Sequence, residues 1–140
     1  MTGAEGTVGA LAEVVGIGVD VVDVDRFRAV LARRPRLADR VFTAEERSYA
    51  ARQADPTRRL AARFAAKEAV LKAMGVGLGA CALRDIEVVR AASGRPSVAL
   101  HGTAVGVAER CGVGAWHLSL SHSDLVATAT AVAVRRVVRS

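Results

Sequence analysis

The stretch TRRLAARFAAKEAVLKAMG, residues 57–75, decides the fold of this chain. It is rich in alanine and contains no glycine or proline before Gly75, and so it predicts one long helix over residues 58–74. At the helical repeat its large apolar side chains fall on one face, which predicts that the helix packs against a hydrophobic core. This stripe consists of Leu60, Phe64, Leu71 and Met74.

Two charged side chains, Glu68 and Lys72, lie four residues apart on the border of that stripe. They flank a face formed by Ala61 and Ala65, whose small side chains allow another element to approach the helix closely. The carboxylate of Glu68 and the ammonium group of Lys72 would then lie at the contact with that element. An ordinary ion pair between Glu68 and Lys72 on a solvated face is the alternative interpretation.

The segment EVVGIGVDVV, residues 13–22, is rich in β-branched residues and predicts a buried strand. Alternation along the strand places Asp20 on the same face as Gly18 and Val22. A buried carboxylate requires a partner, and the strand pattern alone favours a structural ion pair over a metal site. Magnesium does accept two carboxylates together with water and phosphate oxygens, so Asp20 and Glu68 are candidate ligands if they meet.

The rest of the chain predicts short helices followed by strands, and therefore an α+β fold in which the long helix covers a central antiparallel sheet. Thr43 and Glu46 match a capping box for a helix over residues 44–53. Pro35 marks the end of the preceding helix. The other predicted elements are helices over residues 24–34 and 103–111, a hairpin of strands 85–91 and 97–101, and strands 115–122 and 125–134.

The 140 residues suit a single domain, which we expect over residues 14–140 after a flexible N-terminal extension, residues 1–13. No signal peptide or membrane span is recognisable, so we expect a cytoplasmic protein that does not bind membranes. Cys81 and Cys111 lack the spacing of metal or redox cysteines and are expected to be reduced, packed thiols.

The net charge of +6 predicts a positive field that attracts an acidic partner. Acidic proteins, phosphorylated cofactors and nucleic acids all meet that description. Aromatic residues make up only 4% of the chain, which leaves few platforms on which the bases of a single strand could stack. We therefore do not expect a nucleic-acid-binding protein.

Four strings in the chain carry a family resemblance. They are GIGVDVVDVDRF (16–27), RFAAKEAVLKAMGVGLG (63–79), GRP (94–96) and WHLSLSHSD (116–124). In this order and spacing they resemble the holo-(acyl carrier protein) synthases, which are 4′-phosphopantetheinyl transferases, over residues 15–134. The resemblance implies that the 4′-phosphopantetheine arm of coenzyme A is transferred to a serine of an apo acyl carrier protein, releasing adenosine 3′,5′-bisphosphate. It also implies magnesium as cofactor and a homotrimer with active sites between subunits.

The resemblance assigns roles to five residues of this chain. Asp20 and Glu68 match the metal-binding positions, and Lys72 and His122 match positions that contact the phosphates of coenzyme A. Arg63 matches a basic position of the nucleotide site. Glu68, Lys72 and His122 are the expected catalytic residues. In the implied trimer, Asp20 and Glu68 lie on one subunit and a neighbour supplies part of the nucleotide site.

The resemblance also implies a docking surface for the acidic recognition helix of the carrier protein. Three arginines and one apolar residue in the first helical region would form it, consistent with electrostatic steering around a central apolar contact. A solvated basic face is the alternative. The residues concerned are Arg26, Val30, Arg33 and Arg36.

Several assignments stay open at this stage. The family carries a basic pair for the coenzyme A 3′-phosphate before the metal-bearing helix, whereas this chain reads RQADPTRR, residues 52–59. Arg52, Arg58 and Arg59 are the candidate substitutes. The group that takes the serine proton is either Glu68 or a metal-bound water held by a carboxylate such as Asp39. The carrier protein could serve fatty-acid or polyketide synthesis. His101 and His117 are expected to be structural or surface residues.

Overall fold

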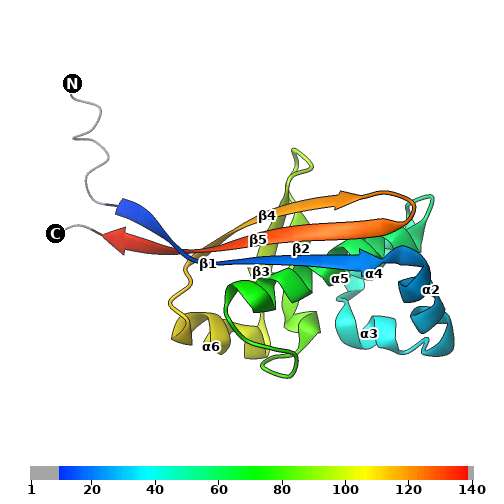
Figure 1. Cartoon of the computed structure of the whole chain (residues 1–140), viewed down its shortest axis with the longest axis horizontal. Helices are drawn as coiled ribbons and strands as arrows, with labels where there is room; N and C mark the ends of the chain where they lie inside the picture. The colour runs from blue at the N-terminus through cyan, green and yellow to red at the C-terminus, as the bar shows by residue number, and fades with distance from the viewer. Residues whose placement is uncertain (1–9, 139–140) are drawn as a thin grey trace.

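A computed structural model of the protein describes residues 10–138. Strands and helices follow one another in the predicted order, and the fold is α+β, as expected (Figure 1). The elements are β1 (Ala10–Asp23), α2 (Val24–Arg33), α3 (Leu37–Val41), α4 (Ala44–Ala51), α5 (Pro56–Ala73), the 3₁₀ helix η1 (Leu83–Asp85), β2 (Ile86–Arg90), β3 (Pro96–Leu100), α6 (Gly102–Arg110), β4 (Ala115–His122) and β5 (Val126–Val138).

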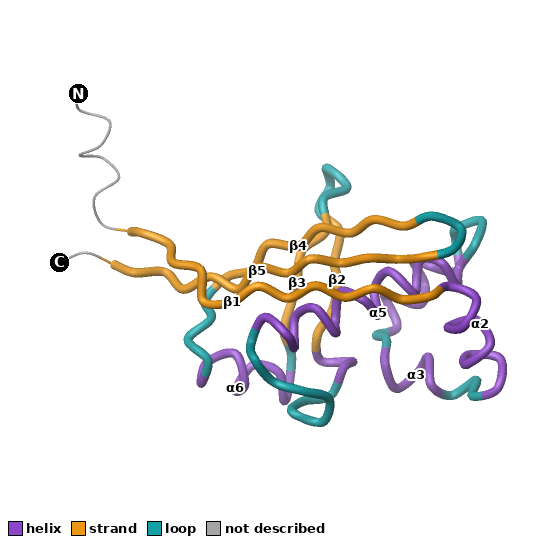
Figure 2. The backbone as a smooth tube through the Cα atoms, viewed as in Figure 1, coloured by secondary structure: helices purple, strands orange, loops and turns teal. Residues whose placement is uncertain are grey.

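Three antiparallel strands in the order β1-β5-β4 form the main sheet, and β2 and β3 form a separate hairpin. In the main sheet Asp20 lies opposite Ala129, and Ala129 lies opposite Leu120. Figure 2 shows β1 and β5 continuing together beyond the end of β4, and the helices lying on one side of the sheet. The helix α5 packs on this side, so the predicted arrangement of a long helix on an antiparallel sheet is confirmed.

The contact between α5 and the sheet is unusually close because both surfaces are built from very small residues. A Cβ atom placed on Gly18 would lie 1.9 Å from the carbonyl oxygen of Ala69, and one on Gly16 would lie 1.9 Å from that of Ala73. These alanines continue the i, i+4 row of Ala61, where the sequence predicted a close approach. The opposing face of β5 is formed by Ala127, Ala129, Ala131 and Ala133, all of which are buried.

Burial of α5 extends beyond the predicted apolar stripe. Leu60, Leu71 and Met74 are buried as expected, and the half-buried Phe64 ring packs at a centroid distance of 5.3 Å from Phe27 of α2. Most of the other helical positions are buried as well, because β1, β5, β4, α2 and α4 surround the helix. The residues before α5 also have a clear role: Asp55 caps the helix by accepting a hydrogen bond from the backbone N–H of Arg58 at 3.3 Å.

Two local expectations need correction. The helix α3 was not predicted, because five residues are too few to show a helical repeat. The predicted N-terminal extension is too long, since residues 10–13 belong to β1, where they pair with residues 135–138 of β5 and Glu13 forms an ion pair with Arg135. Residues 1–9 of the extension lie outside the described residues. None of the helices within residues 10–138 combines the length and apolarity needed to cross a membrane.

A buried ion pair ties α5 to α4 and to the β2–β3 hairpin. The Lys67 ammonium donates to Glu46 Oε1 at 2.8 Å and to the carbonyls of Leu83 and Ile86, and the side chains of Lys67 and Glu46 are fully buried. Glu46 also completes the predicted capping box with Thr43, and its second oxygen accepts from the backbone of Val88 at 2.9 Å. Burial lowers the pKa of Lys67, and the Glu46 carboxylate opposes that effect. A residue predicted only as a helix cap is therefore also a core residue.

The close contact predicts a large difference between two glycine substitutions. Gly18→Ala places a methyl group against the backbone of α5, which cannot yield without moving the helix, so we expect the free energy of unfolding to fall by at least about 2 kcal/mol. Gly77→Ala is the control, because a Cβ there meets nothing within 4 Å, and its effect should stay within about 0.5 kcal/mol. Urea unfolding followed by circular dichroism measures both. Equal stability of the two variants would refute the close contact.

The two charged lysines of α5 should differ sharply in their contribution to stability. Lys67→Met leaves Glu46 and two carbonyls buried without their donor, so we expect a loss of about 3–5 kcal/mol. Lys72→Met, at a side chain that is 53% exposed, should cost less than about 1 kcal/mol. The same unfolding measurement tests both, and a small effect of Lys67→Met would show that the buried pair does not stabilise the fold.

Candidate functional site

A groove between β1, α2, α3 and α5 contains the two carboxylates that the sequence analysis paired. Asp20 from β1 and Glu68 from α5 both line this groove, which has a volume of about 710 Å³. The groove also takes in apolar side chains of the surrounding elements, among them Phe27, Phe64 and Leu78. The structure therefore brings together a strand carboxylate and a helix carboxylate that are 48 positions apart in the chain.

Lys72 joins this cluster through contacts with the strand. Its ammonium donates to Asp20 Oδ1 at 3.1 Å and to the carbonyl oxygen of Val19 at 3.0 Å. The Asp20 side chain is only 17% exposed, so in this structure the ion pair that the strand pattern favoured is present. The partner of Lys72 is thus Asp20, and the alternative of a plain Glu68–Lys72 pair on a solvated face does not describe the site.

The surroundings of Glu68 oppose its ionised form. Burial raises the pKa of Glu68, the nearby Asp20 raises it further, and Lys72 acts in the opposite direction. Asp20 and Glu68 thus lie in one groove, which Asp23 and Arg26 also line, and Lys72 pairs with Asp20. Within residues 10–138 no group of three or more His, Cys, Asp or Glu side chains could hold a metal ion. A magnesium ion held by Asp20 and Glu68 would therefore take its other ligands from water and substrate, as magnesium commonly does.

A second, smaller cavity lies between α5, β4 and the β2–β3 hairpin, and contains the other two predicted nucleotide residues. Arg63 and His122 line it together with Arg59 and Arg90, and its volume is about 210 Å³. Burial lowers the pKa of His122, and Arg59 and Arg58 lower it further. Among the described residues, the buried Nδ1 of His122 has no hydrogen-bond partner.

Within one chain the two cavities are separated by α5. Arg63 precedes Glu68 by five positions, which places the two side chains about 140° apart around the helix. His122 lies on β4 opposite Ala127 of β5, which in turn lies opposite Val22 of β1. One chain thus brings Asp20, Glu68 and Lys72 together on one side of α5, but it places Arg63 and His122 on the other side.

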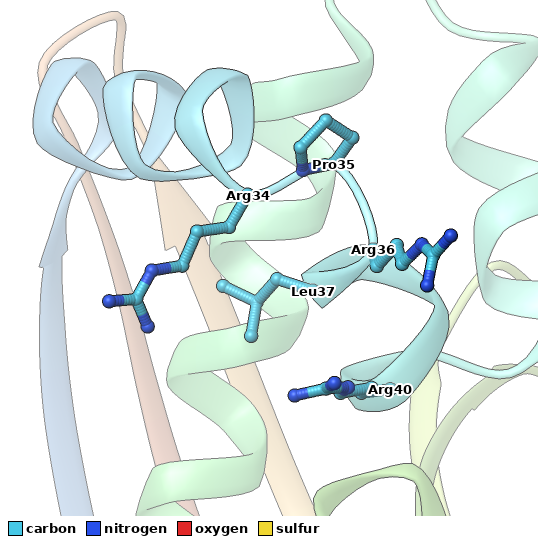
Figure 3. A pocket seen from close by; sticks show the side chains of 5 residues that line it. All are labelled: Arg34, Pro35, Arg36, Leu37 and Arg40. Atoms are coloured by element: carbon cyan, nitrogen blue, oxygen red, sulfur yellow. The ribbon is translucent and has the colours of Figure 1, made fainter.

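The predicted docking residues lie at one end of the groove. Arg26 and Val30 line it directly, and Arg33 and Arg36 are exposed on the adjoining surface. Figure 3 shows a neighbouring pocket, in which Leu37 lies between Arg34 and Arg40 while Arg36 points away from them. The sequence does not single out Arg34, Leu37 and Arg40, because the short α3 that brings Leu37 and Arg40 beside Arg34 was not predicted.

The remaining candidates are engaged elsewhere. Asp39 forms an ion pair with Arg47 at 3.1 Å and does not line the groove. Arg58 forms an ion pair with Asp124. Arg52 donates to Ser48 at 3.1 Å. Of the two other histidines, His101 contacts Glu87 at 2.8 Å and His117 is exposed on β4, in agreement with structural and surface roles. Cys81 and Cys111 are free, half-buried thiols, as expected.

Comparison with known proteins identifies the family. The model of the 4′-phosphopantetheinyl transferase superfamily matches residues 16–130. A holo-(acyl-carrier-protein) synthase of Frankia casuarinae is 54% identical over 120 residues, covering 86% of this chain and 97% of the relative.

The crystal structure of the Neisseria meningitidis synthase superposes with a TM-score of 0.79 at 32% identity, over 86% of this chain and 98% of that one. The Bacillus anthracis synthase, solved in complex with coenzyme A, gives a TM-score of 0.72 at 33% identity, over 87% and 97% of the two chains. This chain belongs to the holo-(acyl-carrier-protein) synthase family of the 4′-phosphopantetheinyl transferase superfamily.

Proposed function

We propose that this protein transfers the 4′-phosphopantetheine arm of coenzyme A to a serine of an apo acyl carrier protein, releasing adenosine 3′,5′-bisphosphate, with Mg²⁺ held by Asp20 and Glu68. The observation that carries the proposal is the groove in which these two carboxylates meet beside an arginine-rich helix. The carboxylates of the groove suit a cation that also binds phosphate oxygens. The arginines at its rim suit an acidic protein. The family of the chain makes phosphopantetheinyl transfer the reaction that combines them.

The residues of the groove have complementary roles in this reaction. When bound, Mg²⁺ would neutralise charge on the pyrophosphate oxygens as the phosphorus is attacked. Lys72 needs only to exchange its hydrogen bonds to Asp20 and Val19 for a phosphate oxygen, which its half-exposed ammonium can do without disturbing the core. Arg63 and His122 would hold the nucleotide that leaves. Asp39 is engaged with Arg47, so Glu68 is the better-placed acceptor of the serine proton, either directly or through a water molecule.

The separation of the two cavities supports a site shared between copies of the chain. Asp20 and Glu68 lie on one side of α5, and the cavity of Arg63 and His122 lies on the other. The face of β1 that points away from α5 is apolar and uncovered, with Ile17 62% and Val21 61% exposed. An apolar surface of this kind favours association. A homotrimer that buries this face could set the nucleotide cavity of one copy against the metal groove of the next.

The surface around α2 supports docking of an acidic carrier protein. Arg26 and Val30 line the groove, and Arg33 and Arg36 extend the positive surface beyond it. An acidic helix bound to these residues would bring the carrier protein to the rim of the groove. We expect the reaction to take place in the cytoplasm, and the carrier protein to serve fatty-acid or polyketide synthesis.

Transfer itself is tested by mass spectrometry. Incubation of the protein with apo carrier protein, coenzyme A and Mg²⁺ should add one phosphopantetheine mass to the carrier, and EDTA should stop the addition. Carrier proteins from fatty-acid and polyketide systems are tested in parallel. Absence of any mass gain with several carriers would refute the proposed activity.

Removal of either metal-site carboxylate should abolish transfer without unfolding the protein. Asp20→Asn and Glu68→Gln keep the shape of the side chain but remove the charge that binds the cation, so we expect activity to fall by at least about 100-fold and not to recover at high Mg²⁺. Asp25→Asn, an exposed carboxylate of α2 outside the groove, is the matched control. Circular dichroism confirms folding. Full activity of either groove variant would exclude that residue as a ligand.

Charge reversal on α2 should weaken docking of the carrier protein specifically. For Arg33→Glu we expect kcat/KM for the carrier to fall about tenfold at low salt, with a smaller difference as ionic strength rises. The KM for coenzyme A should not change. Arg110→Glu, the same reversal on α6, which Figure 1 shows far from α2, is the control. Equal effects of the two substitutions would mean that only net charge matters and that α2 is not the docking surface.

A further inference from the structure

The ring of Tyr49 on α4 holds two arginine side chains from different elements. The guanidinium of Arg63 from α5 lies 4.2 Å from the ring centroid, and that of Arg90 from β2 lies 5.3 Å from it. Both distances are within the range of a cation–π interaction, which orients a planar guanidinium. Two like charges that would repel each other are thus held near one point by an aromatic ring.

The same two arginines line the small cavity that contains His122. None of the residues lining it is acidic, and Arg59 adds a third guanidinium. Arg63 is only 3% exposed, and its Nε, like His122 Nδ1, is buried without a hydrogen-bond partner within the described part of the chain. Burial of a charged group without a counter-charge is costly. The cavity is therefore built for an anion that the protein itself does not supply.

Nearby carboxylates do not fill this role. Glu45, Glu46 and Glu87 line a neighbouring cavity that Arg63 and Arg90 also line. Glu46 is bonded to Lys67 and to the backbone of Val88, and Glu87 is bonded to Thr43 and His101. None of the three forms an ion pair with Arg63 or Arg90 among the described residues.

The chemistry of coenzyme A identifies the anion, provided that the proposed function holds. Coenzyme A carries two separate anionic groups, a pyrophosphate and a ribose 3′-phosphate. The pyrophosphate is the reacting group and belongs with Lys72 and the carboxylates of the groove. The basic cavity on the other side of α5 is left for the 3′-phosphate, a dianion for which paired guanidinium groups are well suited.

We infer that Arg90 binds the 3′-phosphate of the nucleotide together with Arg59, and that Tyr49 is the positioning residue that holds Arg90 and Arg63 at this site. This assignment answers a question that the sequence left open between Arg52, Arg58 and Arg59. Of these, Arg58 is paired with Asp124 and Arg52 with Ser48, whereas Arg59 lines the cavity. Arg90 was not among the candidates, because it lies on β2, far along the sequence from the basic stretch of residues 52–59.

A comparison of two substrates tests the role of Arg90. Coenzyme A and 3′-dephospho-coenzyme A differ only in the phosphate concerned, so the ratio of their kcat/KM values reports its recognition. In Arg90→Ala we expect kcat/KM for coenzyme A to fall about tenfold or more while that for the dephospho form is unchanged. Arg84→Ala, which removes the same charge from an exposed site outside the cavity, should leave both values as they are. Equal losses on both substrates, or a ratio like that of the unmodified protein, would overturn the assignment.

The role of Tyr49 is tested by the same ratio in two variants. Tyr49→Leu removes the ring and should lower the preference for coenzyme A several-fold, whereas Tyr49→Phe retains the ring and should retain the preference. A merely structural role would reduce activity on both substrates equally. An unchanged preference in Tyr49→Leu would show that the ring does not position the arginines.

A direct binding measurement separates this inference from the proposed function. If the unmodified protein transfers nothing, the function has failed, but the cavity can still be tested by calorimetric titration with adenosine 3′,5′-bisphosphate and with adenosine 5′-monophosphate. We expect the bisphosphate to bind more tightly, and Arg90→Ala to remove most of the difference. Equal affinity for the two nucleotides in the unmodified protein would overturn the inference alone.

Discussion

The rest of the structure depends on the close contact between α5 and the sheet. Glycines on β1 and alanines on β5 and α5 remove almost every side chain from this contact, so the helix backbone lies directly on the strands. A single methyl group on Gly18 would overlap the carbonyl oxygen of Ala69. Because the backbones are so close, side chains at the edges of the contact can reach from the helix to the strand. Lys72 can therefore reach both the side chain of Asp20 and the backbone of β1.

One helix thus serves three purposes through its i, i+4 rows. The alanine row, which includes Ala69 and Ala73, lies against β1 and β5. Phe64 and Glu68, from the row that ends in Lys72, line the groove, and the row of Arg59, Arg63 and Lys67 faces β4, α4 and the hairpin. Lys67 and Glu68 are neighbours in sequence but lie in different surroundings, since Lys67 is buried against Glu46 and Glu68 lines the groove. The buried pair of Lys67 with Glu46 fixes α4, and α4 carries Tyr49.

The same arrangement explains why a single copy of the chain looks incomplete as an enzyme. With α5 lying across β1 and β5, the carboxylates are left at the β1 edge and the basic cavity at the β4 edge. Coenzyme A must contact both kinds of site at once if the proposed function is correct. The exposed apolar residues of β1 offer a surface through which a second copy could supply the missing half. Catalysis and assembly would then depend on the same sheet.

The sequence by itself determined the order of the elements and all of them except the short helices α3 and η1, because helix caps, glycine stops and the strand and helix repeats are local signals. It also determined the identity of Asp20, Glu68, Lys72, Arg63 and His122 as candidates, through their place in family strings. Only the tertiary structure decided which of them meet. Asp20 and Lys72 pair across 52 positions, whereas Arg63 and Glu68, five positions apart, face different cavities. Local spacing cannot predict Tyr49 between Arg63 and Arg90 or Glu46 against Lys67, because each contact joins separate elements, and their meeting depends on how closely α5 packs on the sheet.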